Sequence, residues 1–143
     1  MLSMVEIEWA AICEDAHERD FGTADLIGAG IRFLFSPGLP ARAPLCLALR
    51  VAAREPDLEE AQLDMKLREP DLNELPVGGS ATLRVIGPED PSLSPPGGVV
   101  RVFSILRFPL AIRQEGLHSL ELYLDGDRKY SVPFSVRLPT TPP

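Results

Sequence analysis

The chain has 143 residues, a length at which a compact domain buries about 68–70% of the surface of its unfolded chain, so neither a disulfide nor a metal is needed to hold the fold. Its 21 acidic and 14 basic residues give a net charge of −7, and the basic residues form no run. Because this charge repels phosphate backbones and anionic membrane surfaces at long range, we expect no nucleic-acid partner. No apolar run approaches the ~20 residues needed to span a bilayer, so we expect no membrane insertion.

Alternating apolar and polar residues predict two strands in the first quarter of the chain. In the first strand, Glu6 and Glu8 oppose an apolar face made of Val5, Ile7, Trp9, Ala11 and Cys13. An acidic, turn-rich segment at 14–22 ends this strand. A second strand follows at 25–35, where Gly28 and Gly30 indicate a bulge or a close backbone approach. We expect these two strands to pair as a hairpin with a long loop.

The middle of the chain predicts three more strands, at 45–53, 63–67 and 81–85. In the strand at 45–53, the odd-numbered residues face inward, while Cys46, Ala48 and Arg50 face outward or toward a second layer. The pattern Arg-Glu-Pro-Asp-Leu, followed by two polar residues, begins at Arg54 and again at Arg68. We interpret both copies as strand exits with a short helical turn rather than as a duplicated docking motif.

The last third of the chain contains the clearest signal. A Pro/Gly-rich loop at 87–98 precedes a strand at 99–108 that is apolar on both faces, as expected of a central strand or one covered on both sides. Residues 120–138 then alternate around the turn at Asp125 and Gly126, which predicts a β-hairpin.

These elements predict an all-β fold, a single antiparallel β-sandwich of the Ig-like or C2-like kind with seven to nine strands. We expect one domain over 1–143, with a flexible tail at 139–143. The expected inward residues are Ile7, Trp9, Phe33, Leu47, Leu49, Leu63, Met65, Leu83, Val102, Leu122, Leu124, Val132, Phe134 and Val136.

Acidic residues near the N-terminus raise two metal hypotheses. Zinc-ligand types gather at 13–20 but lack the spacing of a closed structural zinc site. Calcium suits the loops of a β-sandwich better, and it would require three acidic residues to meet two others at one end of the fold: Asp15, Asp20 and Asp25 with Asp125 and Asp127. We predict no cofactor and keep a calcium-dependent, C2-like module as the alternative.

Signatures of catalysis and sugar binding are weaker still. Nucleophilic catalysis needs a base beside a nucleophile, and neither His17 nor His118 lies in a known motif. Tyr123 is the main aromatic residue on a polar face, which is too little for a sugar platform. We therefore predict a protein that is not an enzyme, with an unrecognised enzyme as a further alternative.

Two pairs of short motifs carry a resemblance to a known family. Near the start, Cys-Glu-Asp-Ala begins at Cys13 and Ile-Gly-Ala-Gly begins at Ile27. Near the end, a Gly-x-x-x-Leu-x-Leu-x-x-Asp-Gly hairpin begins at Gly116, and Pro-Phe-Ser-Val begins at Pro133. The chain resembles a family of short bacterial β-sandwich proteins, a domain of unknown function. The resemblance implies a bacterial, cytoplasmic β-sandwich and no catalytic residues.

The sequence favours a non-enzymatic protein-binding or assembly module of a bacterial cytoplasm, binding a protein partner or a second copy. Glu6 and Glu8 interrupt any signal peptide, and Cys13 and Cys46 sit in strands, so we expect free, buried thiols. Two loops are candidate docking sites, an acidic one at 14–22 and a proline-rich one at 87–98. Their candidate partner-binding residues are Asp15, Glu18 and Asp20, and Glu89, Asp90, Pro91, Pro95 and Pro96.

Overall fold

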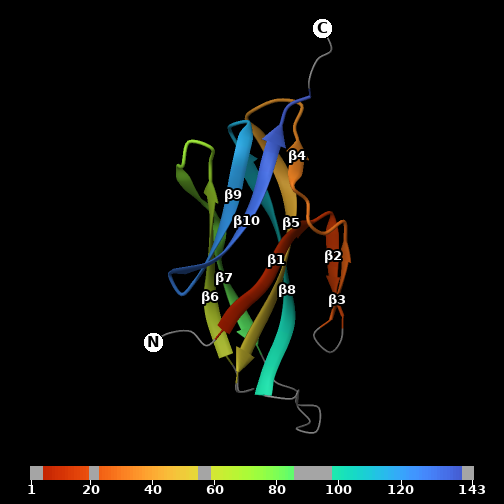
Figure 1. The fold of residues 1–143 in the computed structure, drawn as a ribbon, viewed down its shortest axis with the longest axis vertical. Coiled ribbons are helices and arrows are strands. Elements are labelled where there is room, and N and C mark those ends of the chain that lie inside the picture. The colour runs from red at the N-terminus through yellow and green to blue at the C-terminus, as the bar shows by residue number, and fades with distance from the viewer. Residues whose placement is uncertain (1–4, 20–22, 55–58, 86–97, 140–143) are drawn as a thin grey trace.

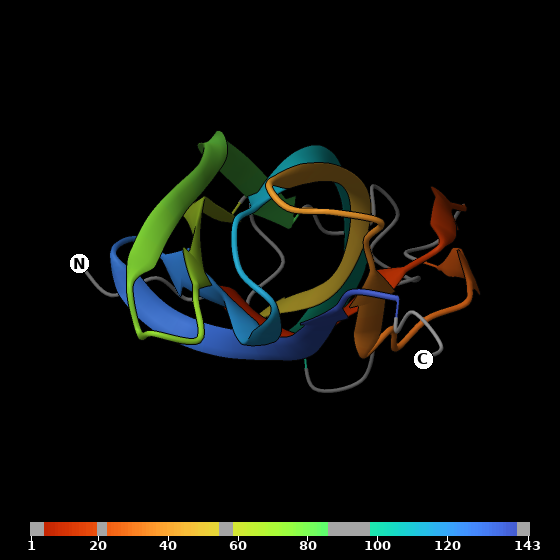
Figure 2. The same cartoon turned by 90° about the horizontal axis from the view of Figure 1, so that it is seen from above.

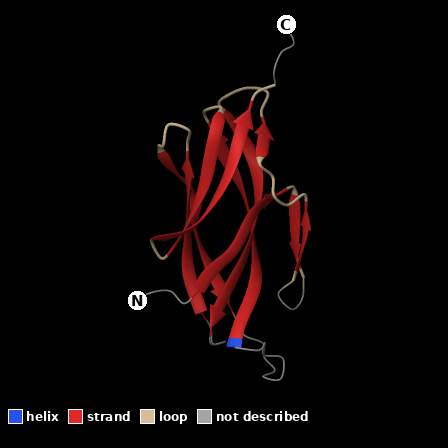
Figure 3. Cartoon of the chain, in the orientation of Figure 1, coloured by secondary structure: helices blue, strands red, loops and turns tan. Residues whose placement is uncertain are grey.

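A computed structural model describes residues 5–19, 23–54, 59–85 and 98–139, and most of them lie in strands. Figure 3 shows strands joined by loops, with helix confined to Gly98 among the described residues. The predicted all-β class is therefore confirmed. The ten strands exceed the predicted seven to nine, because short strands form where the sequence predicted a loop and one continuous strand.

Two larger sheets and one hairpin make up the fold (Figure 1). The three-stranded antiparallel sheet has the order β1-β5-β8, formed by β1 (Val5–Cys13), β5 (Ala41–Arg54) and β8 (Val99–Ile112). The five-stranded sheet has the order β4-β10-β9-β6-β7, formed by β4 (Phe33–Phe35), β10 (Asp127–Arg137), β9 (Gly116–Leu124), β6 (Glu59–Arg68) and β7 (Glu74–Val85). The separate hairpin pairs β2 (Asp15–Glu18) with β3 (Ala24–Ile27).

The core lies between the two larger sheets, which curve around a shared interior when seen from above (Figure 2). Alternation places one face of each strand inside, and burying those aliphatic side chains supplies the main stabilising free energy. Ten of the predicted inward residues are buried there: Leu47, Leu49, Leu63, Met65, Leu83, Leu122, Leu124, Val132, Phe134 and Val136. Ile7 and Val102 are partly buried and pack against this core.

The predicted inward position of Trp9 is wrong, because β1 contains a β-bulge. The register to β5 shifts between Ile7 and Trp9, so that Glu8 is the extra residue. An extra residue moves the following side chains to the opposite face. Ala10 and Ile12 therefore point into the main core, while Trp9 packs on the outer face, edge-to-face with Phe103 at 6.3 Å between ring centroids.

The predicted strand at 25–35 is also wrong as a single element. It is divided at Gly28 and Gly30, which both have positive φ, into β3 and β4. The expected hairpin with the first strand does not form, since β1 pairs with β5, β3 pairs with β2, and β4 pairs in parallel with β10. Half of the predicted acidic loop is instead strand β2, and Phe33 is exposed rather than inward.

The other strands largely match their predicted patterns. Of the two alternatives predicted for the strand at 99–108, the second holds: β8 lies at an edge of its sheet, and both of its faces are partly covered. The second copy of the repeated pattern forms a turn without a helix between β6 and β7, while residues 55–58 of the first copy lie outside the described part. The predicted Asp125–Gly126 turn joins β9 and β10.

Candidate functional site

The β2–β3 hairpin covers a second, smaller core on the outer face of the three-stranded sheet. Beneath it lie Cys13, Cys46 and Ala48, and Ala16 and the partly buried Leu26 pack on them from the hairpin. The predicted second layer over the strand at 45–53 is thus present. The small side chains of the sheet leave room for Ala16 and Leu26 to pack on this face, which buries both thiols.

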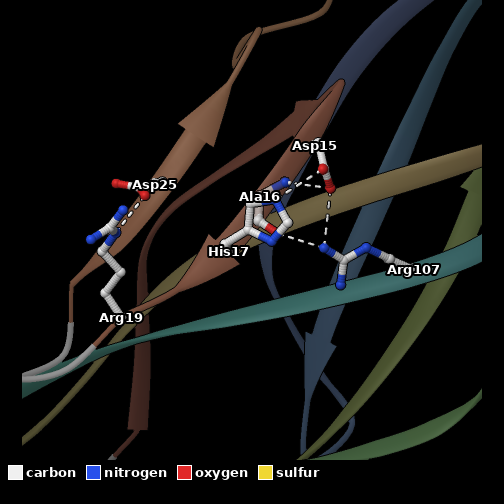
Figure 4. A network of polar contacts seen from close by, with 6 residues as sticks. All are labelled: Asp15, Ala16, His17, Arg19, Asp25 and Arg107. Carbon is white, nitrogen blue, oxygen red and sulfur yellow. Dashed lines mark hydrogen bonds and ion pairs between the residues drawn. The ribbon is translucent and has the colours of Figure 1, made fainter.

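A polar network fixes the hairpin to β8 (Figure 4). The Arg107 guanidinium donates to Asp15 Oδ1 at 3.1 Å and to the Ala16 carbonyl, while His17 Nε2 lies 3.0 Å from Asp15 Oδ2. The hydrogen bond from Arg107, assisted by the Ala16 N–H, holds the pKa of Asp15 below its usual value. Arg19 and Asp25 form a second ion pair across the hairpin. Both aspartates of the hairpin, Asp15 and Asp25, are therefore paired with an arginine.

The free, buried state predicted for Cys13 and Cys46 is confirmed. Burial raises the pKa of both thiols, and the neighbouring Cys46 raises the pKa of Cys13 further. The two residues face each other across β1 and β5. The Ile12 carbonyl accepts hydrogen bonds from the N–H groups of Gly30 and Ile31. The backbone N–H and C=O of Ile12 therefore face away from β5.

Because the direction of the backbone groups alternates along β1, the N–H and C=O of Cys13 face β5. Cys13 and Cys46 are therefore a pair joined by backbone hydrogen bonds, and the Cα atoms of such a pair are about 5.5 Å apart. The Cβ atoms of directly opposite residues are about 4.5–5.5 Å apart, and the hydrogen-bonded pairs are the wider ones. A disulfide brings its Cβ atoms to about 3.8 Å. The register of β1 on β5 therefore favours two separate thiols.

The two N-terminal motifs meet at the base of this hairpin. The Glu14 N–H donates to the Ile27 carbonyl at 2.9 Å. Gly28 has a φ of 60°, and a Cβ placed on it would lie 2.6 Å from Glu14 Cγ. The close neighbour of Gly28 is thus the Glu14 side chain rather than another backbone, while Gly30 has open space around it, and these motif residues shape the end of the hairpin.

A second closed polar cluster holds the β6–β7 turn. Glu69 is fully buried and accepts two hydrogen bonds from Arg113, one of them from Nε at 3.1 Å, and these raise the pKa of Arg113. Gln114 donates to Asp71 at 3.1 Å, which lowers the pKa of Asp71 together with the Asn73 N–H. The second copy of the repeat thus anchors its turn to the β8–β9 connection.

The two histidines lie in very different places. His17 is exposed on β2 beside Asp15. His118 is buried in the main core, where it stacks on Phe134 with ring centroids 5.4 Å apart, and its Nδ1 lies 2.9 Å from the Gly116 carbonyl. Its Nε2 has no hydrogen-bond partner among the described residues. Sequence alternation alone could have placed His118 inward, since it shares a face with Leu120 and Leu122.

The open region of the molecule is a surface at β4 that the sequence did not reveal. Phe33, Phe35 and Leu117 are 48%, 74% and 64% exposed. Ser135 pairs with Phe33 on one side and with Leu117 on the other, so Phe33, Ser135 and Leu117 form one row across β4, β10 and β9, and Phe35 lies two residues further along β4. We call Phe33, Phe35 and Leu117 the apolar patch.

Two grooves flank the apolar patch. One of about 640 Å³ runs between β1 and β10, with Phe33 and Leu117 at its border and Arg32 as its single charged lining residue. The other, of about 600 Å³, lies beneath the 36–40 connection and is bordered by Phe35 and Arg42. Concave, apolar surfaces with few polar groups are the usual form of a binding site.

The predicted docking residues are only partly described. Asp15 lies in the Arg107 network and Glu18 is exposed at the end of β2, whereas Asp20 lies outside the described residues. The same is true of Glu89, Asp90, Pro91, Pro95 and Pro96. Within the described ranges, no three His, Cys, Asp or Glu side chains gather as metal ligands, and no helix is long and apolar enough to cross a membrane.

The fold and these sites define a class, an all-β protein of two packed sheets with an apolar edge surface. A family model matches residues 8–137, and the chain belongs to that family, the family of unknown function DUF6941. No curated protein matches the chain.

Among solved structures, 24 chains match. One is the Pseudomonas fluorescens alkylpurine DNA glycosylase AlkC, bound to DNA containing an abasic site analogue. It is 10% identical with a TM-score of 0.52, over 96% of this chain and 31% of that protein. The chain thus spans under a third of that protein's length, and the likeness concerns the fold alone.

Proposed function

We propose that this chain is a non-enzymatic protein-binding or assembly module of a bacterial cytoplasm. The observation that carries the proposal is the apolar patch, three large exposed side chains that lie on β4 and β9, on either side of β10. Exposed apolar clusters of this kind mark interaction surfaces. The two flanking grooves can each accept a side chain of a partner.

The net charge of −7 supports a protein partner or a second copy over a nucleic acid or a membrane. The calcium-dependent and enzymatic alternatives receive less support. The carboxylates of Asp15, Asp25 and Asp125 are engaged by Arg107, Arg19 and the Gln62 N–H. Neither His17 nor His118 is hydrogen-bonded to a serine or cysteine among the described residues.

The test compares capture of binding partners from an extract of the source cells, quantified by mass spectrometry. We expect the double variant Phe33→Ser/Phe35→Ser to lose the partner that the unmodified chain retains. Leu72→Ser is the matched control, because Leu72 is as exposed as Phe35, at 74%, but lies in the β6–β7 turn. Light scattering on the same variants reports whether the partner is a second copy.

Two results would contradict the proposal. Equal retention by the double variant and by Leu72→Ser would remove the apolar patch from the interface. A partner lost only when the 87–98 segment is changed at Glu89, Asp90, Pro91, Pro95 and Pro96, or when Asp15, Glu18 and Asp20 are neutralised, would place docking on the loops that the sequence predicted.

A further inference from the structure

The backbone of β4 offers a free edge at the residues that carry the exposed rings. The Ser135 N–H donates to the Arg32 carbonyl at 2.7 Å, and the Ser36 N–H donates to the Arg137 carbonyl at 3.0 Å. Arg32 and Ser36 therefore face β10. Backbone direction alternates along a strand, so the N–H and C=O groups of Phe33 and Phe35 face away from β10, at the end of the sheet.

The other sheet edges are less suited to pairing with a partner. Pro109 lies in edge strand β8, and Pro76, Gly78 and Gly79 lie in edge strand β7. Edge strand β1 has a bulge at Glu8, and its Ile12 carbonyl is already occupied. Proline, bulges and charges are the features that block strand addition. The short β4 has none of them within Phe33–Phe35.

Most of the arginines that form no ion pair with a described residue lie around β4. Seven arginines form ion pairs: Arg19, Arg50, Arg68, Arg84, Arg101, Arg107 and Arg113. Four exposed arginines form no ion pair with any residue that the structure describes; Arg128 lies at the far end of β10, while Arg32, Arg42 and Arg137 lie around β4. The Arg137 guanidinium instead lies 5.0 Å from the centre of the Phe33 ring.

Nearby Glu115 forms no ion pair with these arginines in the described structure; its Oε2 accepts the Leu138 N–H at 2.8 Å. An acidic chain thus presents three unpaired guanidinium groups around two exposed phenylalanines. Guanidinium groups bind carboxylates with paired hydrogen bonds. The surface is complementary to a segment that carries carboxylates beside apolar side chains.

We propose that an extended, acidic segment of a partner protein adds to the outer edge of β4 as a further strand. Its backbone pairs with Phe33 and Phe35, its apolar side chains enter the two grooves, and its carboxylates meet Arg32, Arg42 and Arg137. Strand addition of this kind draws affinity from the backbone and specificity from alternate side chains. This inference rests on the proposed function and adds the chemistry of the partner.

The test measures binding of fluorescein-labelled ten-residue peptides by fluorescence anisotropy. The probe alternates glutamate with valine, and its matched control has glutamine in place of each glutamate. We expect the control peptide to bind about tenfold more weakly, with the difference shrinking in high salt because the charges lie at an exposed rim. A probe methylated on the backbone nitrogens that face β4 should lose binding, since it lacks the ladder donors.

Protein variants test the same claim from the other side. The triple variant Arg32→Gln/Arg42→Gln/Arg137→Gln should weaken probe binding about tenfold. The triple variant Lys66→Gln/Arg128→Gln/Lys129→Gln removes as much positive charge, with Arg128 and Lys129 at the far end of β10 from β4, and should not. Thermal unfolding confirms that both variants fold.

Equal weakening by both triple variants, full binding of the glutamine peptide, or no effect of methylation would overturn the inference. Phosphatidylserine vesicles that bind in place of the peptide, with the same dependence on Arg32, Arg42 and Arg137, would also overturn it. If capture of the natural partner depends on Phe33 and Phe35 but not on the three arginines, the proposed function stands and this inference falls.

Discussion

The β2–β3 hairpin and the short strand β4 are both small additions to the sandwich, and they are built in opposite ways. The hairpin covers Cys13, Cys46 and Ala48, and its aspartates Asp15 and Asp25 are paired with Arg107 and Arg19. Strand β4 exposes Phe33 and Phe35, and the arginines around it have no carboxylate partner among the described residues.

The hairpin contributes to the stability of the fold, whereas the exposed side chains of β4 remain available for binding. An element that buries apolar atoms and satisfies its polar groups gains its stability within the chain. Exposed rings and guanidinium groups without a carboxylate partner contribute little to folding, and they remain available to a partner. The comparison predicts that changes in the hairpin alter stability, while changes at the exposed residues of β4 alter binding.

The largest expected effect on stability is at the base of the hairpin. Gly28→Ala should destabilise the protein by about 2–3 kcal/mol, because it adds a Cβ at positive φ and forces it against Glu14. Gly30→Ala is the matched control, since Gly30 also has positive φ but open space around it, and should cost about 1 kcal/mol. Urea unfolding measures both. Equal costs would show that the Glu14 side chain moves aside without cost and that only the positive φ matters.

Within β4, neighbouring residues should behave differently. Leu34 is partly buried against the main core, so Leu34→Ala should cost about 1–2 kcal/mol in the free energy of unfolding. Phe35→Ser should stay within about 0.5 kcal/mol of the unmodified chain, as is usual for an exposed position. Urea unfolding again gives the comparison. A large loss from Phe35→Ser would mean that the exposed ring serves the fold and would weaken the case for a binding surface.

A smaller effect is expected on the rate at which thiol reagents label the two cysteines beneath the hairpin. In the native protein, Cys13 and Cys46 should resist thiol reagents and react on unfolding, because both are buried. Arg107→Gln removes the hydrogen bonds to Asp15 and Ala16, so it should make labelling several-fold faster without changing the fold. Arg84→Gln, which breaks an ion pair between β6 and β7, should leave the labelling rate unchanged.

The fold could be predicted where local alternation decides the structure. Leu47, Leu63, Leu122 and Phe134 were assigned inward and are buried, because period-two patterns fix which residues share a face. Alternation does not reveal an extra residue such as Glu8, which reverses the face of Trp9. Nor does it show which face meets the core when both are apolar, and for that reason Phe33 was wrongly placed inside.

The candidate site was harder to predict from the sequence, because it is formed by strands that are far apart along the chain. The parallel contact of β4 with β10 joins residues about a hundred positions apart, and no local pattern encodes that choice. Ion pairs such as Asp15 with Arg107 are equally distant in sequence. One usable signal was present: Phe-Leu-Phe at Phe33 is apolar on both faces, and a short strand with such a pattern must either be covered twice or remain partly exposed.

The smallest expected effect is electrostatic and concerns Asp15. Its lowered pKa means that folding favours the ionised carboxylate. The stabilisation is complete above the usual pKa of an aspartate, and it is lost as the pH falls through the lowered folded value. Arg107 is the main cause, so NMR titration should show the pKa of Asp15 rising toward its usual value in Arg107→Gln. The pKa of Asp71 is lowered by Gln114 and Asn73 instead, so it should not move. A shift at both residues would indicate a general loss of structure, and no shift at Asp15 would show that Arg107 does not close the hairpin electrostatically.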